Sequence, residues 1–273
     1  MPTSLERALA PEASPRRDRY ASGMSSEVLP GAEPTYHSGP AAGALLLHDL
    51  AGTPQVMRGL AEALSRNDFT VEVPLLPGHG TQIGDLEVTN WDDWVSAAQL
   101  ALDELASRTG PVLVGGIAMG ATLACWVAAQ NPDVAGVVAI NPRAIPVPGE
   151  AVEMLRAMLA EGITAVPPLG PDISDRTARV IAYDTVPVAT LLSMFEAIES
   201  MSEEWDTLKA PMLIINSARD HRVSPAHGDW LDEKISGPVE RLLLEHSFHE
   251  ATVDVEHEDL ENAVINFARR VMG

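Results

Sequence analysis

Short apolar runs of strand length alternate with segments of helical periodicity along most of this chain. The predicted strands cover residues 44–47, 69–73, 111–114, 134–141, 211–215 and 239–244. The predicted helices follow at 54–66, 91–105, 119–130, 225–235 and 257–271. This alternation predicts the α/β class, with a mostly parallel, doubly wound sheet covered by helices. The carboxyl ends of such strands meet at one edge, where ligands of these folds bind.

The alternation breaks between Asn141 and Lys209, over a stretch too long for an ordinary connection. Its apolar residues recur at helical spacing and are Met154, Leu155, Met158, Leu159, Leu191, Leu192, Met194, Phe195 and Ile198. We expect short amphipathic helices here, lying over the strand ends as a cap at residues 143–205. The core then comprises 31–142 and 206–273, and residues 1–30, rich in Pro, Ser, Arg and Glu, are expected to form a disordered arm.

The composition excludes several classes of partner. A formal charge of −21 and a pI near 4.6 argue against nucleic acid or an anionic membrane surface, which require a basic footprint. The charged N-terminal segment lacks the apolar core of a signal peptide, and no stretch predicts a membrane span. The single cysteine, Cys125, cannot form an internal disulfide, so a cytoplasmic location is expected. Nothing in the sequence predicts the oligomeric state.

The segment G-I-A-M-G at residues 116–120 lies between a predicted strand and a predicted helix. A nucleophile elbow, G-x-S-x-G, occupies such a position and requires small residues, because the turn is strained and the next helix packs closely against it. Ala118 stands at the third position of the pattern, where the elbow carries serine. Isolated matches of this kind are weak, so the surrounding sequence decides the interpretation.

An aspartate and a histidine follow in the chain order nucleophile, acid, histidine. Asp220 comes just after the strand at 211–215, and His249 follows the strand at 239–244. Alternatively, Asp220 is a surface turn residue and His249 an ordinary loop histidine, with His246 as the competing candidate. His221, His227 and His257 have no acidic or cysteine partners at metal-ligand spacing, so no metal site is predicted. No cofactor is expected.

Several further segments together resemble the α/β-hydrolase superfamily, and within it bacterial carboxylesterases and monoacylglycerol lipases. L-L-L-H at 45–48 followed by G-T-P at 52–54 is similar to the oxyanion-loop segment of that family. L-P-G-H-G-T at 76–81 is similar to its next loop, and W-D-D-W at 91–94 resembles its next helix. The resemblance covers nearly the whole chain from about residue 40.

The resemblance implies an α/β-hydrolase fold with a helical cap, and a serine-type hydrolase of carboxylic monoesters that works through an acyl-enzyme. It implies that Ala118 occupies the nucleophile position, with Asp220 and His249 as the other triad members. His249 would be the general base and then the acid, oriented by Asp220. The backbone N–H groups of Leu50 and Met119 would form the oxyanion hole.

Two residues depart from the family pattern. Asp49 stands where glycine usually follows the loop histidine, which places a carboxylate near the oxyanion loop. Ala118 has no lone pair, so nucleophilic catalysis through this position is impossible. Three accounts of Ala118 stay open: an engineered Ser→Ala change that traps intact substrate, a natural ligand-binding protein on a hydrolase fold, and a different use of the site.

The expected partner is a small-molecule ester. Hydrolysis of carbon–carbon bonds remains an alternative within enzymes, because that chemistry uses the same residue placement. Arg143 directly follows the strand at 134–141 and is a candidate for binding a substrate carboxylate, which would favour half-esters of dicarboxylic acids. A solvated arginine, or one paired with an acid of the cap, is the alternative.

Overall fold

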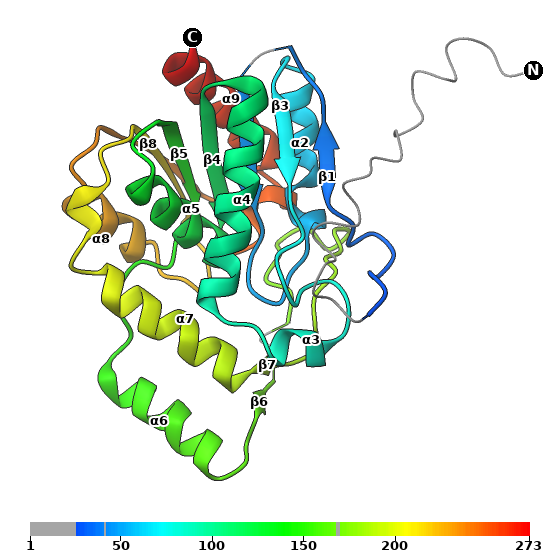
Figure 1. Cartoon of the computed structure of the whole chain (residues 1–273), viewed down its shortest axis with the longest axis vertical. Coiled ribbons are helices and arrows are strands. Elements are labelled where there is room, and N and C mark those ends of the chain that lie inside the picture. Colours follow the sequence, from blue (N-terminus) through cyan, green and yellow to red (C-terminus); the bar gives the residue numbers. More distant parts are fainter. Residues whose placement is uncertain (1–25, 41, 168–169) are drawn as a thin grey trace, which may run out of the picture.

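A seven-stranded sheet organises the chain, with strand order β1-β3-β2-β4-β5-β8-β9 (Figure 1). The structure is a computed structural model that describes residues 26–273 except 41, 168 and 169. The strands are β1 (Thr35–His37), β2 (Gly43–Leu47), β3 (Thr70–Val73), β4 (Val112–Ile117), β5 (Val134–Ile140), β8 (Met212–Ser217) and β9 (Val239–Leu244). Only β1 is antiparallel to its neighbour. The predicted mostly parallel α/β sheet is therefore confirmed, while most of the arm expected at 1–30 lies outside the described residues.

Helices cover both faces of this sheet. The helices outside the segment between β5 and β8 are the short 3-10 helix η1 (Pro54–Met57), α2 (Arg58–Ser65), α3 (Ile83–Glu87), α4 (Trp91–Thr109), α5 (Met119–Gln130), α8 (Ala226–Lys234), the short 3-10 helix η3 (Ala251–Val253) and α9 (His257–Met272). One apolar core packs α4 and α5 against the sheet, and the other packs α2 and α9 against the opposite face. The inner strands β2 and β4 are buried along their whole length because helices lie on both sides of them.

Local sequence explains where the long helix α4 begins. The Asn90 side chain accepts hydrogen bonds from the N–H groups of Asp92 and Asp93, and the Asp93 carboxylate accepts the Asn90 N–H in return. This capping box pairs backbone donors that a helix N-terminus leaves free. Trp91 and Trp94 in the first turn are buried, which fixes the start of α4 beside the carboxyl ends of the strands.

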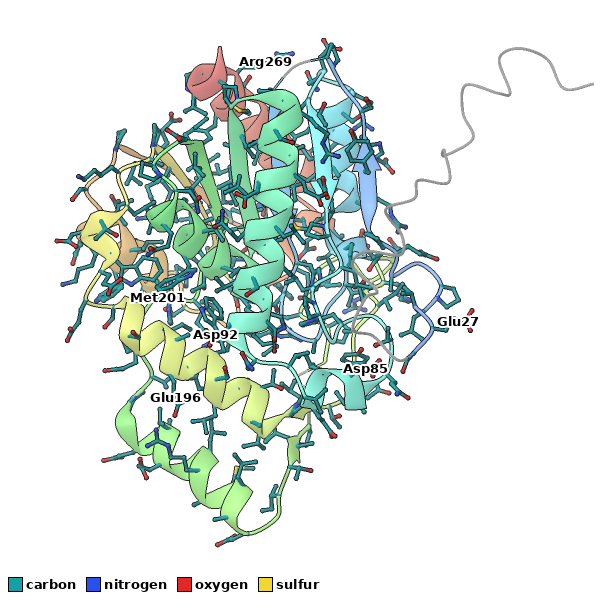
Figure 2. The ribbon with its side chains drawn as sticks, in the orientation of Figure 1. Glu27, Asp85, Asp92, Glu196, Met201 and Arg269 are labelled. Carbon is teal, nitrogen blue, oxygen red and sulfur yellow. The ribbon has the colours of Figure 1, made fainter. Side chains whose placement is uncertain are left out.

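The segment between β5 and β8 lies beyond the carboxyl ends of the strands (Figure 1). It contains α6 (Gly149–Ala160), the two-residue strands β6 (Ala165–Val166) and β7 (Val186–Pro187), α7 (Val188–Met201) and the 3-10 helix η2 (Trp205–Thr207). Glu196 of α7, labelled in Figure 2, accepts a hydrogen bond from Arg156 of α6 at 2.7 Å. On the apolar face of α6 only Leu155 is buried, whereas Met154 is 58% exposed, because α6 packs mainly against α7.

No helix in the described part of the chain is long and apolar enough to cross a membrane.

Candidate active site

Ala118 occupies a strained turn between β4 and α5. Its φ of 51° and ψ of −112° lie in a region that residues with a side chain rarely adopt. Its backbone N–H donates to the Ile140 carbonyl at 2.9 Å, which ties the turn to β5. The turn holds the Ala118 methyl group at the wall of the pocket, at the place where an elbow presents its nucleophile.

The two glycines of the elbow are required by close backbone approach. A Cβ atom on Gly116 would overlap the backbone of Gly120, and a Cβ atom on Gly120 would overlap the Leu47 carbonyl at the end of β2. The pattern of small residues is therefore explained by packing of the turn against α5 and β2. The same packing directs the first backbone N–H of α5, that of Met119, toward the pocket.

His249 and Asp220 are brought together from two loops at the carboxyl ends of β9 and β8. Nδ1 of His249 lies 2.8 Å from Oδ2 of Asp220, whose side chain is fully buried. Oδ1 of Asp220 accepts the N–H groups of Arg222 and Val223 at 2.7 and 2.8 Å, which fixes the carboxylate. His249 is 3% exposed and lines the same pocket as Ala118. His246 is exposed and does not line it.

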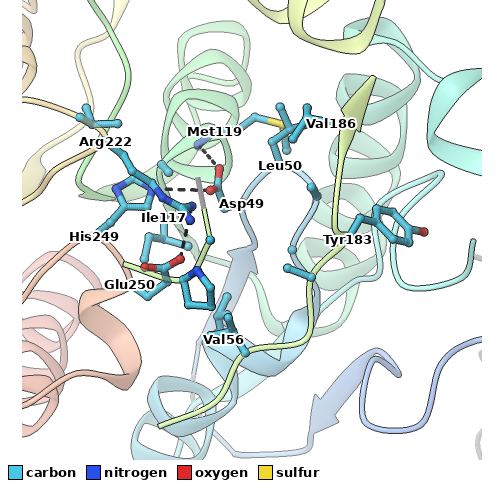
Figure 3. Close-up of a pocket in the computed structure, with 18 of the residues that line it drawn as sticks. Asp49, Leu50, Val56, Ile117, Met119, Tyr183, Val186, Arg222, His249 and Glu250 are labelled. Carbon is cyan, nitrogen blue, oxygen red and sulfur yellow. Dashed lines mark hydrogen bonds and ion pairs between the residues drawn. The ribbon is translucent and has the colours of Figure 1, made fainter. Parts of the chain in front are cut away.

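The Asp49 carboxylate lies between Met119 and His249 (Figure 3). Oδ1 of Asp49 accepts the backbone N–H of Met119 at 3.0 Å, and Oδ2 lies 3.6 Å from Nε2 of His249. The backbone N–H of Leu50 also interacts with this carboxylate. Both N–H groups that the resemblance assigns to an oxyanion hole therefore contact the Asp49 carboxylate.

The electrostatics of this cluster keep it ionised. Burial lowers the pKa of His249, but hydrogen bonds and charges from Asp220 and Asp49 outweigh burial and raise that pKa to about 9. Burial likewise raises the pKa of Asp49, yet the contacts with His249, Met119 and Leu50 bring it below its ordinary value. At neutral pH the ring is therefore an imidazolium held between two carboxylates.

Two arginines and a glutamate form the polar part of the pocket wall. Nη2 of Arg143 donates to the Arg222 carbonyl at 3.2 Å, and the Arg143 guanidinium lies over the Phe195 ring at 5.9 Å. Nη1 of Arg222 lies 3.3 Å from Oε1 of Glu250, while its Nε is buried without a hydrogen-bond partner in the described ranges. Burial raises the pKa of Glu250 to about 7, against the lowering effect of Arg222. Near neutral pH, Glu250 therefore only partly neutralises the guanidinium beside it.

The pocket has a volume of about 580 Å³, which suits a small organic ligand. Its apolar wall comes largely from the segment between β5 and β8 and includes Val166, Tyr183, Val186, Leu191, Met194 and Phe195. The part of the pocket at the strand ends is therefore lined by charged groups, and the opposite wall is apolar.

Two buried histidines, His48 and His79, and the cysteine Cys125 have structural roles. Nε2 of His48 accepts the Leu76 N–H at 3.1 Å and its Nδ1 donates to the Asp49 carbonyl at 2.9 Å, while burial lowers its pKa to about 3. Burial also lowers the pKa of His79, to about 4, and raises that of the Cys125 thiol, to about 12. These groups are therefore neutral at ordinary pH. Within the described ranges, no group of three or more His, Cys, Asp or Glu residues could hold a metal ion.

Two supporting residues were not predicted from the sequence. Asn141, at a φ of 45°, donates from its side chain to the His249 carbonyl at 2.9 Å and accepts the Ser217 N–H at 2.8 Å. Oδ2 of Asp172, from the segment between β5 and β8, accepts the His249 N–H at 3.3 Å and the His221 N–H at 3.0 Å. No local motif marks these residues, because each acts on parts of the chain distant in sequence.

The sheet and the elbow define this chain as an α/β-hydrolase. Residues 39–256 match the family described as Serine aminopeptidase, S33, and the chain belongs to that family. It is 35% identical to the thermostable monoacylglycerol lipase of Bacillus sp. (strain H-257), over 84% of this chain and 91% of that protein.

Two solved structures illustrate the similarity of fold. One, described with "LipS and LipT, two metagenome-derived lipolytic enzymes", is 32% identical with a TM-score of 0.85, over 89% of this chain and all of the other (100%). The monoacylglycerol lipase of Paleococcus ferrophilus is 21% identical with a TM-score of 0.72, over 86% of this chain and 96% of its own. At this identity the second structure supports the fold alone.

Proposed function

We propose that the pocket is the site of a carboxylic ester hydrolase in which Ala118 stands at the position of the nucleophilic serine. The observation that carries this proposal is the 2.8 Å contact between Asp220 and His249 beside the Ala118 elbow. An imidazole oriented by a buried carboxylate, next to a strained turn, is the arrangement that deprotonates a serine hydroxyl. The lipolytic relatives support esters as the substrate class.

In a form that carries both Ala118→Ser and Asp49→Gly, neutral His249 would take the hydroxyl proton as the oxygen attacks the ester carbonyl. The C–O bond to the alcohol then breaks, the imidazolium protonates the departing alcohol, and an acyl-enzyme remains. Water, deprotonated by His249, then attacks the acyl group. The C–O bond to the serine oxygen breaks, that oxygen takes the proton back from the imidazolium, and the carboxylic acid is released. The Met119 and Leu50 N–H groups would hold the oxyanion in both steps, provided that they are free.

The substrate that fits the pocket is an ester with a medium-sized apolar group. Leu, Met and Phe side chains line the upper wall, and such residues adapt to hydrophobic ligands. Arg143 belongs to this proposal as a binding residue for a carboxylate on the ligand, because it is one of the residues that line the pocket. A preference for acetyl esters over longer or aromatic esters would contradict the role given to the apolar wall.

The chain as it stands would bind such an ester without transferring its acyl group, because a methyl group cannot attack a carbonyl. This is expected both of an engineered substrate-trapping variant and of a natural ligand-binding protein. The Asp49 carboxylate favours the second account, since an exchange of serine for alanine does not explain a second departure at the oxyanion loop. Carbon–carbon bond hydrolysis remains the alternative reaction.

The test restores the hydroxyl in a protein whose oxyanion donors are free. We expect Ala118→Ser combined with Asp49→Gly to hydrolyse p-nitrophenyl esters and to be labelled by a serine-directed phosphonate. Adding His249→Ala to the double variant should abolish the hydrolysis. A folded double variant that neither hydrolyses a broad ester panel nor takes up the phosphonate would overturn the proposal and leave a binding protein.

A further inference from the structure

The side chain of Asp49 lies within the site, although catalysis by a serine has no use for a carboxylate at this position. Its two oxygens meet the Met119 N–H at 3.0 Å and His249 Nε2 at 3.6 Å, and the Leu50 N–H adds a third contact. We propose that Asp49 is an internal occupant of the oxyanion hole that blocks acyl transfer independently of Ala118. This inference rests on the proposed function and deepens it, because it names a residue of the same site that would block the proposed reaction.

Occupancy is the first reason. A tetrahedral intermediate places its negative oxygen between the same N–H groups that Asp49 already engages. A substrate carbonyl must therefore displace a hydrogen-bonded carboxylate, or else develop negative charge beside it without these donors. Loss of one oxyanion-hole donor costs about 10²–10³ in kcat in a serine protease with the same triad, and here the Met119 donor is already engaged.

The state of His249 is the second reason. A general base must be neutral to accept a proton from a hydroxyl group. Asp49 faces the ring nitrogen that would accept this proton, and Asp220 holds the other one. An imidazolium between these two carboxylates already carries the proton, so the ring is a poor base at neutral pH even with a hydroxyl beside it.

The backbone holds Asp49 in this position. Its carbonyl accepts a hydrogen bond from Nδ1 of buried His48 at 2.9 Å and from the Gly52 N–H at 3.2 Å. The next residues turn sharply, with Ala51 at a φ of 59°. The side chain is 24% exposed and lines the pocket, so a bound ligand would contact it. Asp49, His249 and Asp220 thus form a cluster of charged groups at the end of the pocket that lies against the sheet.

The experiment compares three proteins: Ala118→Ser alone, Ala118→Ser with Asp49→Gly, and Ala118→Ser with Asp49→Asn. The Asn side chain keeps an acceptor in the hole and removes the charge, so it separates occupancy from ionisation. We expect kcat/KM for p-nitrophenyl butyrate to be at least about 100-fold higher with Asp49→Gly than with Ala118→Ser alone. The kcat/KM of the protein with Asp49→Asn should lie between those of the other two proteins.

A second readout is independent of ester hydrolysis. In the unsubstituted chain, NMR should place the pKa of His249 well above that of a free histidine. Asp49→Gly should lower this pKa by about one pH unit or more and move the Met119 amide resonance, because the hydrogen bond to Oδ1 is lost. This measurement needs no nucleophile.

The outcomes separate the two proposals. Equal activity of Ala118→Ser with and without Asp49→Gly would overturn the blocking role while leaving the esterase proposal intact. Inactivity of all three proteins would count against the esterase proposal, and the NMR result alone would then decide on Asp49. If Asp49→Gly changes neither the pKa of His249 nor the Met119 amide resonance, the Asp49 carboxylate does not occupy the oxyanion hole.

Discussion

Asp49 approaches the ring nitrogen of His249 that Asp220 leaves free, with Oδ2 of Asp49 lying 3.6 Å from Nε2. The ring is therefore contacted by a carboxylate at each nitrogen, at 2.8 and 3.6 Å. In a triad the second nitrogen faces the nucleophile instead. This relationship links the site to the pH dependence of stability, because a buried ion cluster contributes to folding only while its members are charged.

The first prediction concerns His249. Its pKa is raised in the folded state from 6.5 to about 9, so its contribution to stability is complete below pH 6.5 and is lost as the pH rises through 9. We expect the free energy of urea unfolding to fall over this interval, by about 3–4 kcal/mol at most. His249→Gln should remove the dependence, whereas His246→Gln, at an exposed position, should retain it. A wild-type curve that is flat over this range would contradict the ion cluster.

The second prediction concerns Glu250, whose pKa burial raises from 4.5 to about 7. For an acid shifted upward, stability is fully present below pH 4.5 and is lost as the pH rises through 7. Glu250→Gln keeps the acceptor for the Asp172 N–H and cannot ionise. The variant should therefore show a smaller loss of unfolding free energy between pH 4.5 and 7.5, measured by urea titration. An identical loss in the variant would exclude Glu250 as the titrating group.

The third prediction concerns Gly120. A methyl group there would meet the Leu47 carbonyl, which belongs to the central sheet and cannot move aside easily. We expect Gly120→Ala to lower the unfolding free energy by about 2–4 kcal/mol or to prevent folding. Gly149→Ala, in the first turn of α6 with no heavy atom within 4 Å of the added methyl, is the matched control and should be neutral or slightly stabilising. Equal effects of the two changes would show that the elbow does not pack as described.

The sequence predicted the sheet well because its inner strands are continuous apolar runs. It missed β1 because Thr35, Tyr36 and His37 form an edge strand with no buried residue to reveal it. For α6, the periodicity identified an apolar face without saying what covers it. Met154 lies on such a face and is exposed.

The candidate site shows the same limit of sequence analysis, because a pattern does not say which distant parts of the chain are in contact. Chain order and strand ends were sufficient to select Asp220 and His249, which the structure brings within 2.8 Å of each other. Asp49 was noted only as a departure near the oxyanion loop. Its contact with Met119 joins positions far apart in sequence, so only the packing of the β2 loop against α5 shows that the carboxylate accepts this N–H group.

The fourth prediction concerns Arg143 and ligands that carry a carboxylate. If its guanidinium pairs with such a group, Arg143→Met should weaken binding of a monoester of an aromatic dicarboxylic acid by about 10-fold. The neutral diester of the same acid serves as the control ligand and should bind the two proteins equally. Calorimetry on the chain with Ala118 measures both affinities without turnover. Equal affinity of the half-ester for both proteins would remove Arg143 from the binding site.

The last prediction is that the chain as it stands binds an apolar ester in the pocket and leaves it intact. Removal of the serine in a related triad system lowers kcat by about 10⁶, while the pocket here keeps its volume of 580 Å³ and its apolar wall. Calorimetry should therefore detect saturable binding of a medium-chain ester, with product over several hours no higher than in buffer.

A matched pair of substitutions locates the binding. Leu191 lines the pocket from α7, so Leu191→Trp should fill the space and abolish binding. Leu100 is 51% exposed on α4, away from the pocket residues, so Leu100→Trp adds the same bulk and should leave the affinity unchanged. Unchanged binding in both variants would mean that the ester binds elsewhere. Loss of binding in both variants would mean that the loss does not come from filling the pocket. Rapid hydrolysis by the unsubstituted chain would show instead that a group other than residue 118 attacks the ester.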